Sequence, residues 1–88
     1  MSVQVHLSSH VRSYTGGEPD VEADGRTLAE LMLDLDRRYP GIRFRVIDEQ
    51  DRIRRHMKFV VAGEAVTDLG HPVLPGAEVH ILGSLSGG

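Results

Sequence analysis

The chain of 88 residues contains no cysteine. This absence excludes disulfide bonds, a thiol nucleophile, and zinc or iron–sulfur sites built on thiolate ligands. Long hydrophobic runs are also missing, since the longest uninterrupted one, residues 59–62, is far shorter than the roughly 20 residues that span a bilayer. No signal-peptide pattern opens the sequence. We therefore expect a cytoplasmic protein with no membrane partner.

Strong charge and abundant aromatic residues are missing as well. The formal net charge is −3, and there is no tryptophan, two tyrosines and two phenylalanines. None of these aromatics alternates with an exposed basic stripe, as platforms for nucleic acid require, so we expect no nucleic-acid partner. Acidic residues concentrate in segment 18–36 and basic ones in segment 43–58. Such asymmetry can steer a partner, although two solvated faces would produce the same pattern.

The length allows a single domain, and a domain of this size buries only about 60–65% of its unfolded surface. A deep enclosed active site and a hydrophobic core would compete for the same small interior. The size therefore favours a binding or carrier module over a free-standing enzyme.

Hydrophobic periodicity predicts the secondary structure. Val3, Val5 and Leu7 alternate with polar residues, which indicates a strand with one buried face, and a turn at 15–19 leads into a second short strand. A helix is predicted over residues 28–39. Thr27 and Glu30 form the T-x-x-E capping pattern at its start, and one apolar stripe follows with helical spacing: Leu28, Leu31, Met32, Leu35 and Tyr39.

The second half of the chain predicts further strands. Segment 42–56 is expected to be a loop or a short irregular helix. Strands are expected at 57–62, followed by a turn at 62–64, and at 78–82. The element order predicts an α+β fold in which a mixed four- to five-stranded sheet packs on one main helix. We expect one domain over residues 1–83 and a flexible tail over residues 84–88.

The tail ends in Gly87 and Gly88. Because glycine has no Cβ, such a segment can pass through a narrow channel and approach another molecule closely. Its end would be an α-carboxylate, which is unreactive until it is activated, for example as an acyl-adenylate. A carboxyl arm without side chains at its end, on a compact body, suits a carrier.

The chain resembles the MoaD/ThiS family of sulfur-carrier proteins, which share the β-grasp fold with ubiquitin. No single motif is specific to this family, but the order of the matching segments, taken together with the terminal diglycine, is specific to it. The matching segments are residues 3–7, the loop 12–17, the helix start 27–31, the segment 38–41, the strand and turn 59–64, the segment 75–79, and Gly87-Gly88.

The resemblance implies a mechanism. An adenylating partner, similar to ubiquitin-activating enzymes, would use ATP and Mg²⁺ to convert the Gly88 carboxylate into an acyl-adenylate. A sulfur donor would then displace AMP and leave a thiocarboxylate for an acceptor enzyme. The chain itself would be a carrier and co-substrate that holds no cofactor, at most the non-catalytic small subunit of a sulfurtransferase complex.

The acceptor is not legible from the sequence, and molybdopterin, the thiazole of thiamine, cysteine and a secondary metabolite are all candidates. The length and the loop at Gly16 and Gly17 are more similar to MoaD-type carriers, so we favour molybdopterin, with a molybdopterin synthase large subunit as partner. Two other functions are compatible with the sequence. One is a ubiquitin-like modifier conjugated through Gly88, and the other is a non-covalent β-grasp adaptor.

A docking surface follows from strand alternation. The last strand would present His80 and Leu82 to solvent, and the strand at 57–62 would present Val60. If these strands are neighbours, the three side chains and Leu85 form an exposed apolar patch beside the tail, and such a patch usually marks an interface. Ubiquitin uses an equivalent place.

The five histidines do not predict a metal site. His6 and His10 are four residues apart, a spacing that aligns side chains on a helix but not on a strand and its exit. Because a metal site needs three or four convergent ligands, we expect no metal.

Overall fold

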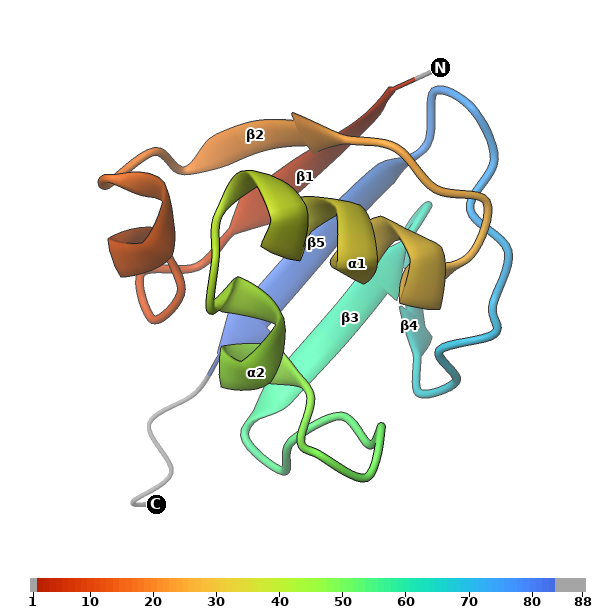
Figure 1. Cartoon of the computed structure of the whole chain (residues 1–88). Helices are drawn as coiled ribbons and strands as arrows, with labels where there is room; N and C mark the ends of the chain where they lie inside the picture. Colours follow the sequence, from red (N-terminus) through yellow and green to blue (C-terminus); the bar gives the residue numbers. More distant parts are fainter. Residues whose placement is uncertain (1, 84–88) are drawn as a thin grey trace.

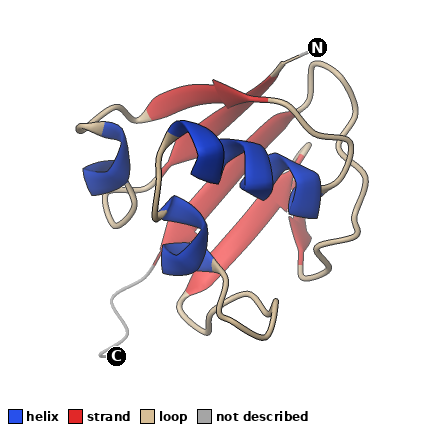
Figure 2. Cartoon of the chain, viewed as in Figure 1, coloured by secondary structure: helices blue, strands red, loops and turns tan. Residues whose placement is uncertain are grey.

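The structure is a computed structural model that describes residues 2–83, and its centre is one five-stranded sheet. The strands are β1 (Val3–Leu7), β2 (Asp20–Ala23), β3 (Met57–Val61), β4 (Glu64–Val66) and β5 (Glu78–Gly83). Their order in the sheet is β2-β1-β5-β3-β4, with β1 and β5 parallel and all other pairs antiparallel. Helix α1 (Leu28–Arg38) lies across one face of this sheet (Figures 1 and 2). The predicted α+β fold is confirmed.

The connection between β1 and β2 contains a short 3₁₀ helix, Arg12–Thr15, that the sequence did not predict. Val11 just before it is fully buried, and the buried Thr15 hydroxyl lies 3.0 and 2.8 Å from the carbonyl oxygens of Arg12 and Glu18. The predicted hairpin is otherwise confirmed, with Val5 paired to Val21.

Helix α1 forms as the sequence predicts and ends one residue earlier. The Glu30 N–H donates to the Thr27 hydroxyl oxygen at 3.2 Å, and the Glu30 carboxylate accepts from the Arg26 N–H at 3.0 Å. Side-chain oxygens therefore accept hydrogen bonds from backbone N–H groups on both sides of the helix N-terminus. The first four residues of the apolar stripe are buried against the sheet, and Tyr39, now the helix C-cap, is partly buried beside them.

Two further elements lie in the second half of the chain, one in segment 42–56, where a loop or a short irregular helix was predicted, and one after the turn at 62–64, where no strand was predicted. Helix α2 (Ile42–Val46) places Ile42 and Val46 in the core, and Ile47 just after it is buried too. The Asp36 carboxylate accepts from the N–H groups of Gly41 and Arg43 at 3.0 and 3.1 Å, which satisfies donors at the helix start. Strand β4 pairs with β3 through the predicted turn, in which Ala62 and Gly63 both have positive φ.

The sheet has one buried and one outward face. In β1, β3 and β5 every second side chain packs under α1 in a single core, and those between point outward. The predicted inward positions Phe59, Val61, Val79 and Ile81 are all buried. The face opposite the helix therefore presents the remaining strand residues to solvent.

Candidate functional site

The outward face of the sheet brings together three predicted site residues. Strand β5 pairs with β3, so Val60 lies directly opposite His80, and Leu82 lies two residues further along β5 on the same side. Val60 and His80 are half-buried, whereas Leu82 is 40% exposed. Val60, His80 and Leu82 are called the outer patch below. The predicted neighbours Leu85, Gly87 and Gly88 lie outside the described residues.

The end of β5 is held firmly beside the outer patch. The Gly83 N–H donates to the Ser8 hydroxyl oxygen at 3.0 Å. A Cβ at Gly83 would lie 3.0 Å from the Cβ of His10 and 3.2 Å from the sulfur of Met57, so the backbone there is closely packed. The last described residue before segment 84–88 is thus fixed between the end of β1 and the start of β3.

A row of polar side chains extends from the outer patch across the sheet. His6 of β1 pairs with His80 of the parallel strand β5 and with Asp20 of β2. The two histidine rings stack with their centroids 4.6 Å apart. His6 Nδ1 lies 2.6 Å from the Asp20 carboxylate, and His6 Nε2 lies 2.9 Å from that of Glu78.

The carboxylates of Asp20 and Glu78 change the pKa of His6. The hydrogen bond to Asp20 is the main cause that raises the pKa of His6 above its usual 6.5, and Glu78 adds to it, while burial opposes both. Sequence spacing missed this cluster because its members come from the two ends of the chain. The alternation of inward and outward side chains along the strands could have indicated the cluster. His6 and His80 both occupy outward positions, and parallel pairing of their strands makes them neighbours.

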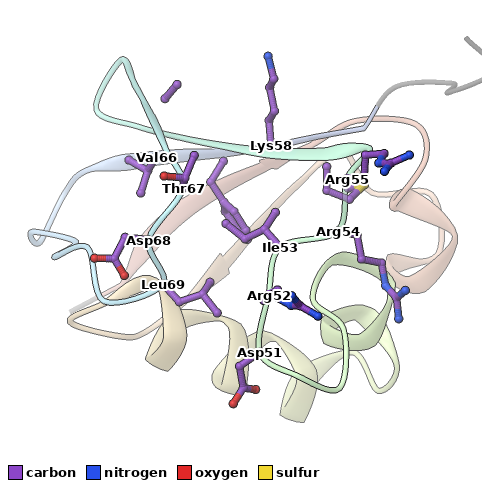
Figure 3. A pocket seen from close by; sticks show the side chains of 13 residues that line it. Asp51, Arg52, Ile53, Arg54, Arg55, Lys58, Val66, Thr67, Asp68 and Leu69 are labelled. Carbon is purple, nitrogen blue, oxygen red and sulfur yellow. The ribbon is translucent and has the colours of Figure 1, made fainter.

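A pocket lies on the other side of β3. It has a volume of about 540 Å³ and lies between the connection that precedes β3 and the one that follows β4. Figure 3 shows Ile53 and Leu69 extending into it, while Lys58 points from β3 to the opposite side. The outer patch and this pocket are therefore separate surfaces.

Asp34 and Asp36 of α1 do not form a catalytic pair. Asp34 bonds to the Asp24 N–H and to Arg38, whereas Asp36 bonds to the backbone at the start of α2. Among residues 2–83, no helix is both long and apolar enough to cross a membrane.

A mixed five-stranded sheet crossed by one main helix, with an exposed apolar patch on its outer face, defines a ubiquitin-like protein of the β-grasp fold. A model of the ThiS family matches residues 5–88, which is nearly the whole sequence. The chain belongs to the ThiS family.

Similar proteins share the full length of the chain. Sulfur carrier protein CysO of Mycobacterium tuberculosis is 32% identical over 93 aligned positions, which cover all of both chains. A solved structure of the Amycolatopsis orientalis BexX/CysO complex contains a chain with 34% identity and a TM-score of 0.89, over 98% of this chain and 99% of that one. The crystal structure of Mycobacterium tuberculosis CysO gives 31% identity and a TM-score of 0.88, over 94% and 99%.

These likenesses confirm the resemblance at the level of the family and the β-grasp fold. They do not confirm the molybdopterin acceptor, because the relatives described above are CysO proteins rather than molybdopterin synthase subunits.

Proposed function

We propose that this chain is a sulfur carrier that holds sulfur as a thiocarboxylate on Gly88. The observation that carries the proposal is the family match, which extends to residue 88 and so includes Gly87 and Gly88. A relative that aligns over its whole length is a sulfur carrier protein by name, which supports the same role.

The chemistry needs a C-terminal carboxylate at Gly88 and a partner that activates it. A carboxylate oxygen attacks the α-phosphorus of ATP, with Mg²⁺ on the phosphates, and pyrophosphate leaves. Sulfide supplied by the sulfur donor then attacks the acyl carbon, the bond from that carbon to the phosphate oxygen breaks, and AMP leaves with the electron pair, which produces the thiocarboxylate. Gly87 has no side chain, so the end of the chain can enter a narrow channel in the partner enzyme. The chain provides the reacting carbonyl and its partners provide the catalysis.

The outer patch is the proposed docking surface for these partners, together with Leu85 of segment 84–88. Leu82 is a large apolar side chain with 40% exposure, and β5 continues directly into segment 84–88. A partner that covers Val60, His80 and Leu82 therefore binds next to the start of that segment. The relative from Amycolatopsis orientalis forms a complex with BexX, which supports the proposal that this chain docks onto a partner protein.

We propose that the carried sulfur is used to form cysteine, one of the acceptors that the sequence left open. The likeness to proteins called CysO favours it over molybdopterin, which the sequence comparison with MoaD-type carriers had favoured.

The test is the intact mass of the protein purified from its native host, followed by fragmentation that localises any added mass. Localisation is essential, because exchange of oxygen for sulfur changes the nominal mass as oxidation of Met1, Met32 or Met57 does. A thiol reagent should also alkylate the carrier form, although the chain has no cysteine. The matched control is the chain without Gly88, which should remain unmodified and unalkylated.

Sulfur at Gly88 would support the proposal. An unmodified Gly88, even after incubation with ATP, the adenylating partner and a sulfur donor, would contradict it and favour a non-covalent adaptor. Conjugates that join Gly88 to lysines of other proteins would favour the modifier instead.

A further inference from the structure

Three potential ligand groups converge on the outer face of the sheet. They are the imidazoles of His6 and His80 and the carboxylate of Glu78, and one ligand atom from each lies within 4.8 Å of the other two. The parallel pairing of β1 and β5 fixes the two histidines side by side, because His6 and His80 are partners in register. The cluster is therefore built on two central strands of the sheet and not on a loop.

The hydrogen bond between His6 and Asp20 sets which nitrogen of His6 is available. An ionised carboxylate only accepts hydrogen bonds, so at 2.6 Å from Asp20 the Nδ1 atom carries the proton. In the neutral ring Nε2 then has a lone pair, and this lone pair faces the Glu78 carboxylate at 2.9 Å. At 2.9 Å this separation fits a proton on Nε2 that is donated to the carboxylate, and a metal ion can take the place of that proton once Nε2 loses it.

We propose that His6 Nε2, His80 and Glu78 bind a divalent transition-metal ion, with Zn²⁺ as the best match. Two imidazoles and one carboxylate are a ligand set that zinc accepts, and three protein ligands leave a fourth position open. Asp20 is the supporting group, since a carboxylate that holds the other nitrogen of a metal-binding histidine orients the ring and raises its basicity.

The site can close around an ion with small movements. Ligand atoms bonded to one zinc lie about 3.3 Å apart, given bond lengths near 2.0–2.1 Å, so His6 Nε2 and the Glu78 carboxylate, now 2.9 Å apart, must separate slightly to admit the ion. The Glu78 side chain is 64% exposed and is free to move. The rings themselves already stack at 4.6 Å.

The open position faces solvent next to the outer patch. A hollow of about 230 Å³ lies beside the cluster, and His6, Asp20, His80 and Leu82 are among the residues that line it. Water fills the fourth position in the free protein, and a side chain of a docked partner can replace it. This site goes beyond the sulfur-carrier role and does not depend on it, because none of its ligands lies in segment 84–88.

Protons compete with the metal for His6. The pKa of His6 is raised by Asp20 and Glu78, and the ring must lose its second proton before Nε2 binds an ion. Zinc therefore binds His6 only when Nε2 carries no proton.

The experiment is a titration of the full, metal-free and sulfur-free chain with ZnCl₂ at about pH 8, followed by calorimetry and by NMR of the imidazole resonances. We expect one ion per chain, with shifts confined to the rings of His6 and His80. His80→Gln and Glu78→Gln should weaken zinc binding by about tenfold or more, and Asp20→Asn by about 10–100-fold. His56→Gln and His71→Gln are matched controls outside the cluster and should bind as the unaltered chain does.

Three outcomes would overturn the proposal. One is the absence of zinc binding while the ring of His6 still titrates, which would mean that only a proton occupies the gap. Another is unchanged affinity in His80→Gln. The last is an equal loss in His56→Gln or His71→Gln, which would indicate scattered binding to surface histidines. Circular dichroism of each variant excludes loss of fold as the cause, and all the substituted ligands lie on the outward face.

Discussion

Gly25, in the connection between β2 and α1, lies where the backbone approaches the helix too closely for any side chain. A Cβ at this position would come within 2.4 Å of the Leu31 nitrogen and 2.7 Å of its Cα. Both are backbone atoms of a fully buried residue in α1, so neither can move without the helix. Glycine is required at position 25 because there is no space for a side chain.

We expect Gly25→Ala to lower the free energy of unfolding by about 2–3 kcal/mol, because an added methyl group in a packed region forces a backbone shift. Urea denaturation followed by circular dichroism measures this loss. Gly70→Ala is the matched control, since its Cβ would meet only the Asp68 carboxylate at 3.4 Å, an ordinary contact. Equal losses in the two variants would show that close packing is not what requires glycine at position 25.

At the level of elements, a hydrogen bond to the Asp34 side chain connects α1 to the residue that follows β2. The Asp34 carboxylate accepts from the Asp24 N–H at 2.8 Å and from Arg38 Nε at 2.9 Å, and it also pairs with Arg37. The backbone hydrogen bond from Asp24 is the largest cause that holds the pKa of Asp34 below 3.8. The side chain is only 13% exposed, so this contact is more than a surface ion pair.

Asp34→Ala should therefore destabilise the protein by about 1–2 kcal/mol. A hydrogen bond to a charged group contributes about 1.5–3 kcal/mol, and the better helix propensity of alanine offsets about 0.7 kcal/mol of it. Because the pKa of Asp34 is lowered in the folded state, the difference should be complete above pH 3.8 and should decrease as the pH falls through the folded-state pKa. Thermal unfolding at several pH values measures it.

Arg37→Ala is the control for this prediction, because the Arg37 side chain is 70% exposed and its ion pair contributes about 0.5 kcal/mol or less. A loss in Asp34→Ala that is no larger than the loss in Arg37→Ala would assign the effect to surface charge alone.

Elements were predictable where local signals agreed with one another. Helix α1 has a capping pattern and an apolar stripe, and the structure places it within one residue of the prediction. Helix α2 was predicted only as a loop or a short irregular helix, because its five residues contain two arginines and its start is held by the Asp36 carboxylate of α1. Strand β4 is three residues long, which is too short to display a period of two.

At the level of the whole molecule, the two parts of the outward face differed in how far they could be predicted. Alternation within β3 and β5 was enough to group Val60, His80 and Leu82. The cluster of His6, His80 and Glu78 was not predicted, because His6 and Glu78 are 72 residues apart and meet only through the parallel pairing of the first and last strands. Spacing along the chain carries no information about such a contact.

The outer patch makes a prediction about partner binding. Leu82→Asp should weaken binding to the adenylating enzyme of the same organism by about tenfold or more, because it places a charge in the centre of an apolar contact. The melting temperature should remain almost unchanged, since Leu82 is 40% exposed and leaves the core intact. Surface plasmon resonance with the immobilised enzyme measures the affinity, and calorimetry measures the melting temperature.

Leu33→Asp is the matched control, because Leu33 is 60% exposed on α1, which covers the opposite face of the sheet (Figure 1). It introduces the same charge into a chain of the same composition, so the net charge of the two variants is identical. Weaker binding in Leu82→Asp alone locates the partner on the outward face, where β5 leads into segment 84–88. Equal weakening in both variants would mean that the partner responds to net charge, and unfolding of Leu82→Asp would make Leu82 a structural residue rather than a docking one.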